Sequence, residues 1–237
     1  RNLGRSDGTP RQEINIWAQT RDYRYAVEWI SQRPEADADR IAVWGSSFSG
    51  GEAIVAGVCD ERIKAIVANV PFANLPGVDY ENAPDTFEEI RNNLLDESGR
   101  GLADAGGEVM GPFAVVPEEG NELPVFLDPP EAKKWFIEHG RQAGSRWENR
   151  VAIRNSFGTQ PDFDPGMCVR HISPKPLLML VATKDDMADT EGARAAFERA
   201  GEPKRLVMIE GNHFAAYEGS GFARASEAMR EFLLQYL

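Results

Sequence analysis

Four short runs made up mostly of small and apolar residues, each with the length of a β-strand, stand out along the chain. They cover residues 41–44, 63–70, 177–182 and 205–209. Apolarity that is continuous instead of alternating is typical of parallel strands buried on both faces. Apolar positions at helical spacing predict helices over residues 13–32 and 222–236, the small residues 51–58 predict a third, and a fourth is expected between two strands from about 190 to 200. Strands that alternate with helices predict an α/β fold with a doubly wound, mostly parallel sheet.

Residues 73–172 break this alternation, because they are rich in proline, glycine, acidic and aromatic residues. A structureless loop of that length is improbable in a compact domain, so we expect an inserted helical cap or lid. Its Gly-rich, acidic segment 97–123 is expected to be mobile. The core is then formed by residues 1–72 and 173–237. Candidate helices of the cap are residues 84–95, 129–139 and 144–155.

The segment Gly45-Ser46-Ser47-Phe48-Ser49-Gly50 lies between an apolar run and a stretch of small residues. This order predicts a strand, a sharp turn and a helix, with Ser47 at the apex of the turn. A serine in that position exposes its hydroxyl group, provided that the residues two before and two after it are small. Gly45 and Ser49 meet this demand, so the segment fits the nucleophile-elbow pattern.

Two other serines compete for the apex. Ser46 would need small residues at positions occupied by Trp44 and Phe48, and Ser49 already lies within the predicted helix. The alternative is that the segment is an ordinary Gly/Ser-rich turn between a strand and a helix, with no catalytic role. A phosphate-binding turn fits less well, because neither a Gly-Lys-Ser/Thr ending nor a G-x-G-x-x-G pattern is present.

A serine hydroxyl becomes a good nucleophile only beside a base that an acid orients. Of three histidines, His213 directly follows a predicted strand and is the candidate base. His139 is expected at the surface near a helix end, and His171 in a connection. The candidate acid is Asp185, which follows the most apolar run, with Asp186 as the runner-up. A helix cap is the alternative role for these aspartates, although Asp189 or Thr190 suits it better.

Four segments together resemble the α/β-hydrolase superfamily, in its dienelactone-hydrolase-like, Xaa-Pro-peptidase and cocaine-esterase-like branch with a large cap. The resemblance covers residues 1–72 and 170–237 well and the middle of the chain poorly. It implies a catalytic triad of Ser47, Asp185 and His213, in the order found in that superfamily. The segments that carry it are Arg1-Asn2-Leu3-Gly4-Arg5-Ser6-Asp7-Gly8, Asp39–Gly51, Val181-Ala182-Thr183-Lys184-Asp185 and Glu210-Gly211-Asn212-His213-Phe214.

The resemblance also implies about four strands ahead of Arg1 and an oxyanion hole with two donors. One donor is the backbone N–H of Phe48, which follows the nucleophile. The other belongs to a loop after an early strand. We therefore expect the missing N-terminal strands and this donor to come from an upstream segment or a second chain, and the present chain to be a fragment or a processed product.

Composition excludes several classes of function. The formal net charge of −12 argues against nucleic acid and anionic membranes as partners. Cys59 and Cys168 are too few for a disulfide framework, and a reduced, cytoplasmic setting is the simplest account. No metal-ligand spacing or cofactor fingerprint occurs, so no metal or cofactor is expected. The sequence does not select an oligomeric state, and a homo-oligomer is one of the options.

We therefore predict a serine hydrolase that cleaves a small-molecule carboxylic ester or thioester through an acyl-enzyme on Ser47. Alternatives on the same fold are an acyltransferase, a lactone hydrolase, a polyketide thioester hydrolase and a Xaa-Pro-type peptidase. A non-catalytic binding protein that keeps the fold is an alternative of a different class.

Overall fold

The computed structural model describes residues 1–98, 107–156 and 158–237. These residues form two compact units. Unit 1 consists of Arg1–Gln19 with Glu97–Asp162, and unit 2 of Thr20–Asp96 with Phe163–Leu237. The division into a core and a cap at residues 72 and 172 stays a prediction. The predicted mobile segment falls in part, at residues 99–106, outside the described residues.

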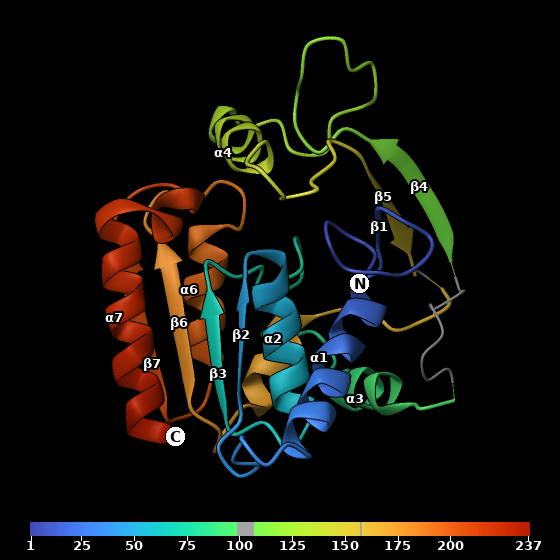
Figure 1. The fold of residues 1–237 in the computed structure, drawn as a ribbon. Coiled ribbons are helices and arrows are strands. Elements are labelled where there is room, and N and C mark those ends of the chain that lie inside the picture. The colour runs from blue at the N-terminus through green and yellow to red at the C-terminus, as the bar shows by residue number, and fades with distance from the viewer. Residues whose placement is uncertain (99–106, 157) are drawn as a thin grey trace. The chain divides into compact units, whose positions relative to one another are not determined.

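Unit 2 contains a sheet of four parallel strands in the order β2-β3-β6-β7. The strands point the same way in Figure 1. The four apolar runs of the sequence are thereby confirmed as strands, and the predicted α/β class with a mostly parallel sheet is confirmed as well. The strands are β2 (Ala42–Ser46), β3 (Ala65–Asn69), β6 (Leu177–Ala182) and β7 (Lys204–Ile209).

Helices connect these strands. Helix α1 (Ile16–Ser31) begins in unit 1 and continues into unit 2, where it precedes β2. Its end is followed by Arg33-Pro34, as predicted. The other helices of unit 2 are α2 (Phe48–Cys59), α3 (Phe87–Leu95), α5 (Pro165–Cys168), α6 (Thr190–Arg199), α7 (Gly219–Tyr236) and the 3-10 helices Val169–His171 and His213–Tyr217.

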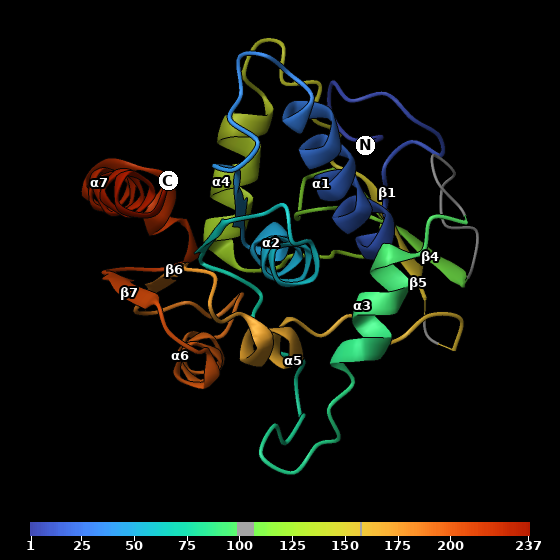
Figure 2. The ribbon, with the colours of Figure 1, turned by 90° about the horizontal axis from the view of Figure 1, so that it is seen from below.

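Side chains of β3 alternate between the two faces of the sheet, and each face is covered by helices. Val67 belongs to an apolar cluster with Leu180 of β6 and Phe232 of α7. The neighbouring Ile66 points to α2, where a Cβ added at Gly57 would come within 2.4 Å of its side chain. Figure 2 shows α7 on one side of β6 and β7 and α6 on the other. Burial on both faces explains why the strand sequences are continuously apolar.

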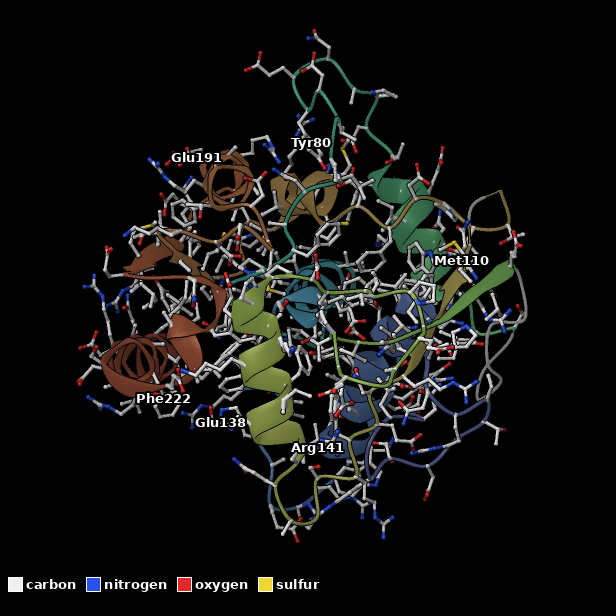
Figure 3. The ribbon with its side chains drawn as sticks, turned by 90° about the horizontal axis from the view of Figure 1, so that it is seen from above. Tyr80, Met110, Glu138, Arg141, Glu191 and Phe222 are labelled. Atoms are coloured by element: carbon white, nitrogen blue, oxygen red, sulfur yellow. The ribbon has the colours of Figure 1, made fainter. Side chains whose placement is uncertain are left out.

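The chain that leaves β3 is tied to the second half of unit 2 by a buried tyrosine, labelled in Figure 3. The Tyr80 hydroxyl donates a hydrogen bond to the Asp164 carboxylate at 2.7 Å. Asp164 also caps α5, because its side chain accepts a hydrogen bond from the Met167 N–H. Burial, with the Asp164 hydrogen bond, raises the pKa of Tyr80, so this phenol stays a neutral donor.

The described part of unit 1 contains a three-stranded sheet in the order β1-β5-β4, helix α4 and the first residues of α1. Its elements are β1 (Glu13–Ile14), β4 (Glu108–Phe113), α4 (Pro130–Gly140) and β5 (Val151–Asn155). Strand β5 runs parallel to β1 and antiparallel to β4. A short ion pair at 2.7 Å joins Arg154 of β5 to the buried carboxylate of Glu13 in β1.

Two of the three helices predicted between residues 73 and 172 are confirmed, as α3 and α4. The third, at residues 144–155, is wrong, because residues 151–155 form the central strand β5. Its neighbours in the sheet come from distant parts of the sequence, Glu13–Ile14 and Glu108–Phe113. Pairing with such strands outweighs the weak local helical preference of the segment.

No helix in residues 1–98, 107–156 or 158–237 combines the length and the apolarity that crossing a membrane requires.

Candidate active site

Ser47 lies between the end of β2 and the start of α2, in a backbone conformation that L-residues rarely adopt. Its φ is 59° and its ψ is −123°. Such a conformation costs about 1–3 kcal/mol and persists only where the surroundings hold it. Here the Ser47 N–H donates to the Asn69 carbonyl and the Ser47 carbonyl accepts from the Phe72 N–H, both at 2.9 Å. The turn at Ser47 therefore has the geometry of a nucleophile elbow.

Small residues around Ser47 are required by space. A Cβ at Gly45 would lie 1.9 Å from the Ser49 carbonyl oxygen, and one at Gly50 would lie 2.8 Å from Pro71. Ser49, the second small position, is fixed inside the first turn of α2, where its hydroxyl donates to the Ser46 carbonyl at 2.9 Å. Ser49 is thus engaged within the turn, and Ser47 occupies the apex.

His213 follows β7 and opens a 3-10 helix that Asn212 caps by accepting a hydrogen bond from the Phe214 N–H. The imidazole is buried, with a side-chain exposure of 2%. Its Nε2 lies 2.9 Å from the Ser47 hydroxyl oxygen. Strands β2 and β7 lie at opposite edges of the sheet, but all four strands are parallel, so the turn after β2 and the loop after β7 leave the sheet at the same end and meet there.

Asp185 follows β6 and holds the other nitrogen of the imidazole. Its Oδ2 lies 2.7 Å from Nδ1 of His213, and its Oδ1 accepts hydrogen bonds from the backbone N–H groups of Met187 and Ala188. Burial would raise the pKa of Asp185, but the His213 contact and these two N–H groups together lower it. The carboxylate is therefore charged near neutral pH, and Nδ1 carries the hydrogen that it accepts.

Neighbouring polar residues have other roles. Asp186 is exposed, so Asp185 and not the runner-up contacts His213. Asp189 precedes α6 but makes no side-chain capping bond. Thr190 accepts a hydrogen bond from the Asp185 N–H at 2.9 Å and donates one to the Ala182 carbonyl at 2.8 Å. Thr190 thus fixes the loop that carries the acid.

The other two histidines have partners of their own. His171 contacts the Asp85 carboxylate at 2.8 Å and stacks on Phe87. His139 is the penultimate residue of α4 in unit 1, next to Trp135.

Three polar residues lie near the Ser47–His213 pair: Ser46, which the sequence analysis weighed only as a rival nucleophile, and Tyr217 and Asn69, which it did not single out. The Tyr217 hydroxyl is 3.5 Å from Nε2 of His213 and 2.8 Å from the Ser46 hydroxyl. The Asn69 side-chain amide donates to the same Ser46 oxygen at 3.0 Å. Sequence signals existed for two of them. Asn69 is the polar last residue of an apolar strand, and Tyr217 lies one helical turn after His213.

Glu52 of α2 is a buried carboxyl group that the sequence did not reveal. Its side chain is 3% exposed, and its Oε1 has no hydrogen-bond partner among the described residues. Burial, followed by the negative charge of Asp22, raises the pKa of Glu52 from 4.5 to about 8. The side chain is therefore a neutral acid at neutral pH.

Phe48, the predicted oxyanion donor, is the first residue of α2. The first N–H groups of a helix have no partner within the helix and carry partial positive charge, which favours an oxyanion nearby. Phe48 is 39% exposed, and its ring lies 6.2 Å from the Phe72 ring, centroid to centroid. The residue that follows the nucleophile thus pairs its ring with that of Phe72, whose backbone N–H contacts the Ser47 carbonyl.

The described part of the chain holds no group of three or more His, Cys, Asp or Glu side chains that could bind a metal ion. Cys59 and Cys168 are buried free thiols.

The contacts from His213 to the Ser47 hydroxyl and to the Asp185 carboxylate place an imidazole where it could accept the proton of the hydroxyl.

Comparison with known proteins places this geometry in context. The acetyl xylan esterase (AXE1) family model matches residues 18–96, which include Ser47. The chain is 28% identical to the thiohydrolase aneE of Aspergillus aculeatus, over all of this chain and 74% of that protein. It is also 28% identical to the acyltransferase drtE of Aspergillus calidoustus, over 89% of this chain and 67% of that protein.

Among solved structures, the α/β hydrolase GrgF of Penicillium sp. sh18 matches all of this chain and 77% of its own, with a TM-score of 0.70 and 26% identity. The more specific branch inferred from the sequence stays a prediction. These likenesses and the parallel sheet with its elbow lead to one conclusion: the chain is a member of the α/β-hydrolase superfamily.

Proposed function

We propose that this protein is a serine hydrolase that cleaves a carboxylic ester or thioester through an acyl-enzyme on Ser47. The observation that carries the proposal is the pair of short contacts from His213, 2.9 Å to the Ser47 hydroxyl and 2.7 Å to the Asp185 carboxylate. Nucleophile, base and orienting acid are therefore within the reach that proton transfer needs.

In the first half of the reaction, the Ser47 oxygen attacks the carbonyl carbon while its proton passes to Nε2 of His213. The Asp185 carboxylate stabilises the imidazolium that forms. The tetrahedral oxyanion accepts a hydrogen bond from the Phe48 N–H. The carbon–heteroatom bond then breaks, the leaving oxygen or sulfur takes the proton from Nε2, and the acyl group remains on Ser47.

In the second half, a water molecule gives one proton to Nε2 and attacks the acyl carbon. The second tetrahedral intermediate collapses, the acid is released, and the proton returns from Nε2 to the Ser47 oxygen. Nε2 thus acts as an acceptor at each attack and as a donor at each bond cleavage. The neutral imidazole that this requires has its Nδ1 hydrogen on Asp185, as the 2.7 Å contact favours.

The substrate class follows from the chemistry and from the relatives. A triad of this kind acts on acyl groups, and the similar proteins include a thiohydrolase and an acyltransferase. The aromatic rings of Phe48 and Phe72 beside Ser47 favour an acyl group with an apolar portion. Small esters and thioesters with such acyl groups are therefore the first substrates to test.

Labelling with a fluorophosphonate tests the proposed nucleophile directly. We expect one equivalent to attach to Ser47 and none to attach in Ser47→Ala, with Ser46→Ala and Ser49→Ala retaining the label. Aryl esters and thioesters should be cleaved, with aminoacyl-proline anilides as the comparison for peptidase activity. Label that persists in Ser47→Ala, or anilides turned over faster than esters, would contradict the proposal.

Acyl transfer is the second candidate, because similar proteins include an acyltransferase and a polyketide transferase of Penicillium. It uses the same acyl-enzyme and differs only in which hydroxyl, thiol or amine attacks in the second half. Product analysis in the presence of an added alcohol separates the two, since transfer yields a new ester and hydrolysis yields the free acid.

A further inference from the structure

The Tyr217 hydroxyl occupies a position next to the His213 nitrogen that handles every proton of the proposed reaction. Its oxygen lies 3.5 Å from Nε2, which is long for a hydrogen bond. The length has a simple cause. A neutral imidazole has a single lone pair at Nε2, and the Ser47 hydroxyl already uses it at 2.9 Å. Tyr217 therefore lies beside the Ser47–His213 hydrogen bond.

The phenol has a second polar neighbour, the Ser46 hydroxyl, and either of the two hydroxyl groups can donate the hydrogen bond between them. The Ser46 hydroxyl lies 2.8 Å from the Tyr217 oxygen and 3.2 Å from the Asn69 carbonyl oxygen. It has a single hydrogen for these two acceptors. When Ser46 donates to Tyr217, the phenol can donate towards the substrate. When Ser46 donates to the Asn69 carbonyl, Tyr217 can donate to Ser46 and its own oxygen can accept.

The surroundings of Ser46 keep this pair in place. The Asn69 side-chain amide donates to the Ser46 oxygen at 3.0 Å in both arrangements. Burial raises the pKa of Tyr217 to about 12, and the negative charge of Asp185 adds to it, while the Ser46 hydrogen bond acts in the opposite direction. The phenol thus keeps its hydrogen at neutral pH and can serve as donor or acceptor.

We infer that Tyr217 is a catalytic residue of the proposed acyl-enzyme reaction that binds the leaving heteroatom in the first half and the attacking water in the second, and so favours hydrolysis over acyl transfer. The inference rests on the function proposed above. The leaving oxygen or sulfur takes its proton from Nε2 and accepts a second hydrogen bond from Tyr217 when Ser46 donates to the phenol. Tyr217 itself transfers no proton.

The attacking water has a different need. It gives one hydrogen to Nε2, and its second hydrogen requires an acceptor, which the Tyr217 oxygen supplies when it donates to Ser46. An alcohol has a carbon atom in place of that second hydrogen, so it cannot donate a hydrogen bond to the Tyr217 oxygen. Tyr217 should therefore lower the barrier for water and leave the barrier for an alcohol nearly unchanged.

The test measures the ratio of new ester to free acid formed from one aryl ester in the presence of an added primary alcohol. In Tyr217→Phe we expect this ratio to rise by about fivefold, the effect of one lost neutral hydrogen bond. Tyr236→Phe on α7 is the matched control, because it also removes one phenolic oxygen and should leave the ratio unchanged. Ser46→Ala is the second variant, and its ratio should shift in the same direction.

The outcomes separate the two proposals. Both products arise from one acyl-enzyme, so a misplaced His213 would slow them together and leave their ratio constant. An unchanged ratio in Tyr217→Phe and Ser46→Ala, with stoichiometric fluorophosphonate labelling, would overturn the role of Tyr217 and leave the serine mechanism intact. Loss of labelling in the parent protein would instead overturn the serine mechanism, and the role of Tyr217 with it.

Discussion

Replacing Glu52 by glutamine should change how the stability of this protein depends on pH. The carboxyl group is buried in α2, and its pKa is raised from 4.5 to about 8, chiefly by burial and then by the charge of Asp22. In the unfolded chain it regains its ordinary value. Between these two pKa values the folded protein holds a proton that the unfolded chain releases.

The sign and size of the effect follow from this difference in bound protons. Unfolding releases a proton in this window, so raising the pH favours the unfolded state. The contribution of Glu52 to the free energy of unfolding is complete below about pH 4.5 and falls by about 1.4 kcal/mol per pH unit until about pH 8. Between about pH 5 and pH 7 the loss amounts to about 3 kcal/mol.

Urea unfolding of the parent protein and of Glu52→Gln over this pH range measures the effect. Glutamine does not titrate, so all other groups cancel when the two curves are subtracted. The variant should gain about 3 kcal/mol relative to the parent between about pH 5 and pH 7. Asp22→Asn should lower the pKa of Glu52, because it removes a negative charge that raises it. The pH range over which the stability falls should then end at a lower pH. A stability difference that stays constant with pH would refute the buried, protonated carboxyl group.

Two further predictions concern the candidate site. Gly45→Ala should destabilise the protein by about 3 kcal/mol or more in urea unfolding, because its Cβ would lie 1.9 Å from the Ser49 carbonyl oxygen. Unchanged stability would mean that the elbow relaxes easily. Asp185→Asn should lower kcat for ester hydrolysis by about 10⁴-fold, since the imidazole would lose its orienting charge. The exposed Asp186→Asn should leave kcat unchanged, and the reverse outcome would move the acid to Asp186.

Strands and most helices could be predicted from local sequence because their burial leaves a strong pattern. The run at 177–182 is apolar throughout and coincides with β6. The helix predicted from Thr190 begins at that residue. The segment 144–155 shows the limit of the approach. Its end is strand β5, held by Glu13–Ile14 and Glu108–Phe113, and no local pattern could reveal partners so far away in sequence.

The candidate triad could be named from the sequence because each member has a local mark. Ser47 has the small neighbours of a sharp turn, while Asp185 and His213 directly follow apolar runs. Asp185 and Asp186 both follow the same strand, so the local pattern does not distinguish them. Burial and the 2.7 Å contact to His213 distinguish them. The surroundings of Tyr217, Ser46 and Glu52 could not be predicted in this way, because they depend on side chains that only the fold brings together.

The positions of the four strands along the chain and the sharp turn at Ser47 could thus be predicted from the amino-acid sequence alone, because burial on both faces of a sheet and the space in a tight turn restrict which residues fit. The tertiary structure alone decided which aspartate contacts the imidazole, which hydroxyl lies next to Nε2 and which carboxyl group keeps its proton. Those properties depend on distances and on exclusion of water between residues that are remote along the chain, and folding creates both.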